Sequence, residues 1–152
     1  MKKIFSFSAV VLLLVACDKG KFETKPQIRL KSINTRELQR FANLKIVLEF
    51  TDKEGDVSDT LFFFRQRLNI NGPLTAITSP YLIPNFPNTP QGEIEINLEY
   101  ANQVVVGIEE IRIPGTNPSE NEPDTMLYKI VVGDKAGNYS DTLTLDQVIV
   151  ER

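Results

Sequence analysis

The stretch EIEINLEY, residues 93–100, decides the fold class, because its polar and apolar side chains alternate without a fault. Successive side chains of a β-strand point to opposite faces, so this alternation is typical of a strand with one buried and one wet face. The apolar face carries Ile94, Ile96, Leu98 and Tyr100. The stretch therefore predicts a half-buried strand, and an all-β protein if the neighbouring segments follow the same rule.

The same kind of pattern extends along the chain in both directions. LKIVLEF also alternates, whereas TLFFF and LYKIVV are apolar on both sides, as central strands often are. In VVVGIEEIRI the apolar phase slips between Ile108 and Ile111, which predicts a β-bulge near Glu109 and Glu110. The predicted strands are 26–33, 43–51, 59–68, 92–100, 104–113, 126–133 and 140–150. Short strands, turn-rich joins and no long helix predict an immunoglobulin-like β-sandwich over residues 26–152.

The segment from Asn69 to Gly92 carries five of the nine prolines. Proline lacks the N–H that a sheet requires, so the segment is predicted to be a long crossover rather than a central strand. Its apolar side chains are expected to cover an open sheet edge. The alternative is a binding loop that exposes aromatic side chains, with Tyr81 and Phe86 as the contact residues.

Two decapeptides that begin 82 residues apart are nearly identical. DKEGDVSDTL begins at Asp52 and DKAGNYSDTL begins at Asp134, with seven of ten positions shared. An Asp at the start of a turn accepts the backbone N–H two residues on, and the glycine that follows suits a left-handed conformation. We interpret both copies as turns that lead into strands. The flanking sequences share little, which argues against a repeated domain.

In an immunoglobulin-like sandwich these two turns would meet at one tip, the first crossing between sheets and the second closing a hairpin. The alternative interpretation is therefore a shared calcium site, because calcium takes six to eight oxygen ligands. Neither copy has the spacing of an EF-hand. The candidate ligands are Asp52, Glu54, Asp56, Asp59, Asp134, Asn138 and Asp141.

The N-terminus has the organisation of a bacterial signal peptide. Lys2 and Lys3 precede an uncharged, mostly apolar run of 13 residues, which is too short to span a bilayer. The run ends in LVAC, and Cys17 is the only cysteine. This end resembles the lipobox of bacterial lipoproteins, which implies lipidation of Cys17 and removal of the residues before it. We expect a signal peptide over 1–16 and a lipidated, polar tether over 17–25.

A second resemblance lies in the domain itself. LEFTDKEGDVSDT and LYKIVVGDKAGNYSDTLTLDQVIV resemble stretches of small bacterial envelope lipoproteins with immunoglobulin-like sandwiches. The resemblance implies a domain anchored in the membrane of the cell envelope, expected at the outer membrane, and leaves open which face carries it. It implies no activity and no catalytic residue.

Asp-Thr followed by an aliphatic residue occurs three times. This motif is similar to the acceptor of some bacterial systems that O-glycosylate exported proteins. The candidate acceptors are Thr60, Thr125 and Thr142. The other interpretation is structural, because Asp commonly ends a turn and β-branched Thr favours the start of a strand.

Composition narrows the function further. The chain has no histidine, and its one cysteine is assigned to lipid, so we expect neither cysteine- or histidine-based catalysis nor a Cys/His zinc site. Losing Lys2 and Lys3 changes the net charge from −3 to −5, which argues against nucleic acid as a partner. We expect a non-catalytic binding or adhesion module for a protein or glycan, with no cofactor unless calcium binds. The alternative is a structural accessory subunit of an envelope complex.

Overall fold

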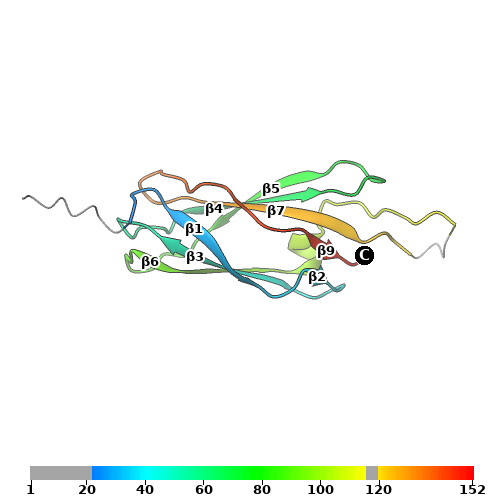
Figure 1. Ribbon diagram of the computed structural model, residues 1–152, viewed down its shortest axis with the longest axis horizontal. Helices are drawn as coiled ribbons and strands as arrows, with labels where there is room; N and C mark the ends of the chain where they lie inside the picture. The colour runs from blue at the N-terminus through cyan, green and yellow to red at the C-terminus, as the bar shows by residue number, and fades with distance from the viewer. Residues whose placement is uncertain (1–21, 116–119) are drawn as a thin grey trace, which may run out of the picture.

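The computed structural model describes residues 22–115 and 120–152. Figure 1 shows two layers of strands with one short helical turn, so the predicted all-β class is confirmed. The expected signal peptide and Cys17 lie outside the described residues, as does most of the expected tether. Within the described residues, no helix has both the length and the apolar character needed to cross a bilayer.

One sheet has three antiparallel strands in the order β1-β3-β6. The strands are β1 (Gln27–Ile33), β3 (Leu44–Thr51) and β6 (Gln91–Leu98). The central strand places Ile46 opposite Ile96 and Leu48 opposite Ile94, so the alternating apolar side chains share one face. The predicted strands 26–33, 43–51 and 92–100 are therefore confirmed, with ends that differ by one or two residues.

The other sheet has the order β2-β9-β7-β4-β5, with a short strand β8 also paired to β7. The strands are β2 (Glu37–Leu38), β4 (Thr60–Arg67), β5 (Ala76–Leu82), β7 (Asp124–Val132), β8 (Leu143–Thr144) and β9 (Val148–Val150). The pair β2 and β9 is parallel, and the remaining pairs are antiparallel. The predicted strands 59–68 and 126–133 correspond to β4 and β7.

The two sheets enclose one apolar core. Leu48 and Ile46 from the first sheet and Phe63 and Tyr128 from the second are all fully buried. The rings of Phe63 and Tyr128 lie 5.2 Å apart between centroids, a separation at which aromatic rings attract each other. Alternation places these side chains inward from both sheets, which is why the sequence pattern predicts the core.

The predicted strand 104–113 is wrong. The chain forms a π-helical turn at Tyr100–Val104 and then runs without a ladder, apart from an isolated bridge between Arg112 and Asn121. The phase slip seen in the sequence marks the loss of the strand and not a bulge within it. Glu109 and Glu110 are both exposed on this irregular segment.

Three buried arginines fix this irregular segment by hydrogen bonding to its backbone carbonyls, a role that a neighbouring strand would otherwise have. Arg65 donates to the carbonyl oxygens of Gln103 and Val104, and Arg67 donates to that of Glu109. Arg152 donates to the carbonyl of Ile108 at 2.7 Å. These guanidinium groups satisfy backbone oxygens that a strand would have satisfied through its ladder.

Asp124 balances part of this buried positive charge. Its Oδ1 lies 3.1 Å from Nη1 of Arg67, and its Oδ2 lies 3.2 Å from Nε of Arg152. Burial lowers the pKa of Arg65, which has no carboxylate ion-pair partner among the described residues. Arg65 and Arg67 occupy inward positions of β4, where alternation from Phe63 would call for apolar residues.

Two further expectations need correction. The predicted strand 140–150 is split into β8 and β9, because its register with β7 shifts by one residue between Thr144, which pairs with Lys129, and Val148, which pairs with Met126. The proline-rich segment is not a crossover without strands, since it contains β5 at the edge of the larger sheet. Pro80 lies on β5 opposite Phe62, where an edge strand tolerates proline.

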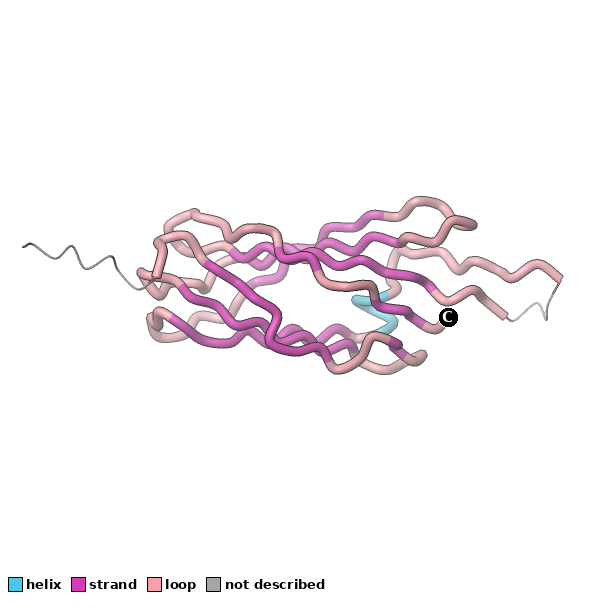
Figure 2. The backbone as a smooth tube through the Cα atoms, viewed as in Figure 1, coloured by secondary structure: helices cyan, strands magenta, loops and turns pink. Residues whose placement is uncertain are grey.

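The molecule is elongated, with different loops at its two ends (Figures 1 and 2). The described chain begins at one end, beside the β3–β4 loop (52–59) and the β7–β8 loop (133–142). The C-terminus lies at the opposite end, together with three loops that we call the distal loops. The distal loops are residues 39–43, 68–75 and 105–115.

Candidate functional site

The two copies of the repeated decapeptide meet at the end where the described chain begins. The first copy forms the β3–β4 loop, which crosses from one sheet to the other, and the second forms the loop of the β7–β8 hairpin. The backbone N–H of Lys135 donates to the carbonyl of Asp56 at 3.3 Å, so the two loops are in contact. The crossing between sheets by the first copy and the hairpin closed by the second copy both agree with the sequence-based prediction that the two turns meet at one tip.

Each copy builds the same turn around its first aspartate. Asp52 Oδ2 accepts the N–H of Asp56 at 3.1 Å, and Asp134 Oδ1 accepts the N–H of Asn138 at 2.7 Å. The accepted N–H is four residues on, and not two as we expected from turn chemistry. Gly55 and Gly137 have φ values of +71° and +87°, the left-handed conformation that glycine adopts without strain. The interpretation of both copies as turns is confirmed.

Three carboxylates converge where the loops touch. Asp52, Asp56 and Asp134 each place an oxygen within 4.8 Å of the others. Asp52 and Asp134 are buried, and Asp56 is half-buried. With an effective dielectric constant near 20, two unit charges at this separation of 4.8 Å repel by about 3 kcal/mol. The cluster is therefore costly if all three groups are ionised and nothing positive lies between them.

Burial raises the pKa of the Asp52 carboxyl, and the neighbouring carboxylate of Asp56 adds to the effect. The backbone N–H groups of Asp56 and Gly55 act in the opposite direction but do not reverse it. Among the described residues, no lysine or arginine forms an ion pair with any of the three aspartates. No basic side chain of the described residues therefore offsets the effect of burial on the pKa of Asp52.

The structure separates the remaining candidate ligands from the cluster or gives them another role. Asn138 donates its side-chain N–H to Asp134 Oδ2 at 2.9 Å, so it orients a cluster member. Glu54 and Asp59 are exposed. Asp141 is exposed and forms an ion pair with Lys25, which lies in the expected tether. The seven sequence candidates thus reduce to three converging carboxylates and one orienting amide.

Tyr81 and Phe86 do not form an exposed aromatic surface. Both are half-buried and pack against the core. The Phe86 ring lies 5.9 Å from that of Phe50, and the Tyr81 ring lies 6.5 Å from that of Phe63. This placement favours the structural role that the sequence offered for the proline-rich segment over the binding role.

The three candidate glycosylation sites differ in exposure. Thr142 is exposed just before β8, whereas Thr60 and Thr125 are half-buried within β4 and β7. Asp124, which precedes Thr125, is fully buried in its ion pairs. The position of all three at or near the start of a strand agrees with the structural interpretation of the motif.

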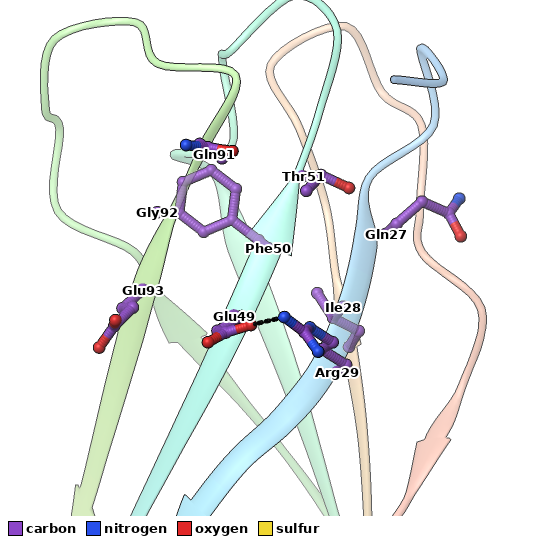
Figure 3. A pocket seen from close by; sticks show the side chains of 9 residues that line it. All are labelled: Gln27, Ile28, Arg29, Glu49, Phe50, Thr51, Gln91, Gly92 and Glu93. Atoms are coloured by element: carbon purple, nitrogen blue, oxygen red, sulfur yellow. Dashed lines mark ion pairs between the residues drawn. The ribbon is translucent and has the colours of Figure 1, made fainter. Parts of the chain in front are cut away.

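A shallow groove of about 540 Å³ crosses the outer face of the three-stranded sheet (Figure 3). One row across its floor is Gln27, Thr51 and Gln91, and the next is Arg29, Glu49 and Glu93. An ion pair joins Arg29 to Glu49, and Lys31 pairs with Glu93 at the rim. Most of the charged side chains on this solvent-exposed face therefore form ion pairs with one another.

The distal loops expose large apolar side chains. Ile70 and Leu74 are 97% and 80% exposed, and Phe41 and Val106 are also exposed. Phe41 has a φ of +63°, a left-handed conformation that is rare for a bulky residue and marks strain. Sequence analysis missed these residues, although a short loop that places isoleucine and leucine around an Asn-Gly-Pro turn is the signal that could have found them.

No family model matches the chain, and no curated protein sequence matches it. Among solved structures it is similar to a β-glucosidase from Listeria innocua in complex with gluconolactone, with a TM-score of 0.42 and 12% identity over 84% of this chain and 16% of that chain. It is also similar to the sporulation control protein Spo0M from Bacillus subtilis, with a TM-score of 0.40 and 10% identity over 84% of this chain and 50% of that chain. The chain thus spans half or less of these proteins, and likenesses this weak carry no functional argument.

Proposed function

We propose that this chain is a non-catalytic binding module, held at the cell envelope by lipid on Cys17, whose distal loops contact a protein partner. One observation carries the proposal. The described chain begins at one end of the molecule, and exposed apolar side chains lie on loops at the other end. A lipid at Cys17 would place the distal loops away from the membrane, where a partner can reach them.

The order of the strands supports an immunoglobulin-like type for the sandwich. In that fold the first, second, fourth and fifth strands share one sheet, and the third, sixth and seventh share the other. The described part of this chain follows that order except that its smaller sheet has no counterpart of the fourth strand. Here β1, β3 and β6 form one sheet, and β4, β7 and β9 lie in the other with β5 at its edge. In such sandwiches the loops at either end present binding residues, which suits the distal loops to this role.

A protein is the partner class that the distal loops favour. Apolar side chains that stay exposed on a free surface are typical of protein interfaces, where they become anchors in pockets of the partner. Ile70 lies on the β4–β5 loop, which packs onto the 105–115 loop, since a side chain at Gly72 would collide with Ile111. Ile70, Leu74 and Val106 are therefore carried on neighbouring loops.

The partner surface is tested by crosslinking in intact cells, followed by capture of the full-length chain. We expect the double variant Ile70→Ser, Leu74→Ser to lower the yield of the protein captured with the wild type by about tenfold, because anchor residues often contribute 1–2 kcal/mol or more. Its thermal stability should stay close to that of the wild type, since neither side chain is buried.

Leu82→Ser provides the matched control, because Leu82 is 84% exposed but lies on β5 outside the distal loops. This variant should capture the partner as well as the wild type does. Equal capture by the distal variant and the control would exclude the distal loops as the contact surface. A loss of capture in both variants would point to a nonspecific apolar interaction.

The anchor is tested separately by Cys17→Ala. Several acyl chains hold a protein on a membrane much more firmly than one, because each buried methylene contributes about 0.8 kcal/mol. We expect the wild type to partition into the detergent phase and the variant into the aqueous phase in a Triton X-114 separation. A variant that still partitions with detergent would show that the membrane attachment does not depend on this cysteine.

A further inference from the structure

Two buried carboxylate oxygens lack a hydrogen-bond donor among the described residues, at the end of the molecule where the β3–β4 and β7–β8 loops meet. They are Oδ1 of Asp52 and Oδ1 of Asp56. Asp52 is completely buried, yet it neither pairs with a basic side chain nor satisfies both of its oxygens. Buried charges in folded proteins are normally paired or bound to a metal, so these oxygens call for a positive partner that the described residues do not provide.

We propose that Asp52, Asp56 and Asp134 bind a calcium ion between the β3–β4 and β7–β8 loops. The oxygens that these residues offer lie within 4.8 Å of one another. Calcium–oxygen bonds of about 2.4 Å place ligands on opposite sides of the ion roughly 4.8 Å apart, so all three fit around one ion. The ion would also replace the mutual repulsion of the carboxylates by attraction.

The donor set favours calcium over other metals. Only oxygen ligands converge here, and hard cations prefer oxygen, whereas zinc and copper prefer the nitrogen and sulfur of histidine and cysteine. Three carboxylates supply three to six oxygens, and water reaching the half-buried Asp56 completes the six to eight that calcium takes. Magnesium demands a compact octahedron and releases its water reluctantly, so this loop-built site suits calcium better.

The bound ion would join the two sheets at the end where the described chain begins. Asp52 directly follows β3 in the three-stranded sheet, and Asp134 follows β7 in the other sheet. The same tip holds the segment that leads into β1, through the ion pair of Lys25 with Asp141 and the hydrogen bond from Lys53 N–H to the Glu23 carbonyl. Calcium is therefore expected to order this end of the molecule as a unit.

The test is thermal unfolding of the full-length chain in detergent, with calcium, magnesium or a chelator. At about 5 mM calcium we expect the melting temperature to rise by roughly 5 °C over the chelated sample, as for an extracellular calcium module of submillimolar affinity. Magnesium should give a clearly smaller rise. Isothermal titration with calcium chloride should give one site per chain.

Charge-removing variants separate an ion site from a purely structural acidic cluster. Asp56→Asn and Asp134→Asn should lose at least tenfold in calcium affinity, and in chelator Asp56→Asn should melt no lower than the wild type because repulsion is relieved. The matched control is Asp59→Asn, which removes an exposed acid from the same loop and should keep the calcium response. Because Asp134 accepts hydrogen bonds from Asn138 and its replacement disturbs the turn, Asp56→Asn decides the matter: Asp52 and Asp134, and not the Asp56 side chain, accept the backbone N–H groups that shape the two turns.

Three results would overturn the proposal. The first is an identical melting temperature in calcium and chelator together with no heat of binding. The second is a calcium response that persists in Asp56→Asn. The third is a magnesium response as large as that of calcium, which would show that the carboxylates select no particular divalent ion.

Discussion

Asp124→Asn should lower the free energy of unfolding by about 3–5 kcal/mol, the range found when one partner of a buried ion pair is removed. Asp124 is fully buried between Arg67 and Arg152, with charged atoms 3.1 and 3.2 Å away. Asparagine keeps the size of the side chain but leaves both guanidinium groups without a counter-charge. Arg65 adds a third buried positive charge nearby on the same strand as Arg67. Urea denaturation followed by circular dichroism measures the loss.

Asp146→Asn is the matched control for this change. Asp146 is exposed and pairs with Arg36 at 3.5 Å, so its loss should cost less than about 1 kcal/mol. Equal stability of the two variants would mean that the surrounding carbonyl oxygens stabilise the buried charges of Arg67 and Arg152 without a contribution from Asp124. The 103–109 segment would then depend on hydrogen bonding alone.

Gly55→Ala should destabilise the protein by roughly 2–5 kcal/mol, although the equivalent change in the second copy of the decapeptide should cost only about 1–2 kcal/mol. Both glycines have a left-handed backbone, with φ of +71° at Gly55 and +87° at Gly137. A Cβ at Gly55 would lie 2.7 Å from the backbone nitrogen of Thr89, whereas one at Gly137 would meet nothing within 4 Å. Backbone cannot move aside as a flexible side chain can, so the collision adds to the conformational strain.

The comparison of the two alanine variants isolates the collision, because each carries the same conformational cost. Thr89 also donates its N–H to the Gly55 carbonyl at 3.0 Å, and this hydrogen bond should be weakened in Gly55→Ala alone. Melting temperatures of both variants, measured in one buffer with chelator, give the difference. If both fall by the same amount, the approach of residue 89 is looser in solution than the structure indicates.

Much of the fold could be predicted because alternation is a local property of sequence. It located β3, β6, β4 and β7 to within two residues, and it placed Ile46 and Leu48 in the core. Alternation gave a wrong prediction where the backbone carbonyls are hydrogen-bonded by side chains and not by a neighbouring strand. The apolar residues of 104–113 suggested a strand, but arginines from β4 and from the C-terminus bind its carbonyls. Hydrogen bonds from residues distant in the sequence produce no periodic pattern. The one sign in the sequence was that Arg65 and Arg67 occupy inward positions of β4, where apolar residues are expected.

The candidate site was predicted in outline and not in detail. The repeated decapeptide indicated that two acidic loops meet at one tip, and the structure brings them into contact. The sequence did not show which carboxylates converge, because that depends on the side-chain directions within each turn. Asp52 and Asp134 point inward since each accepts the N–H four residues on, whereas Asp59 and Asp141 lie beyond the turn and face solvent. The distal apolar residues sit in loops, where no periodicity applies.

The proline at position 80 has a consequence for neighbouring molecules. Thr75 and Ile83 use their backbone groups to bond β4, so the even-numbered positions between them, Pro80 included, direct their nitrogen away from it. An ordinary residue there would offer an N–H to the strand edge of another copy. Pro80 removes one of the outward N–H groups through which this sheet edge could pair with a strand of another molecule, and proline on an edge strand disfavours such edge-to-edge association.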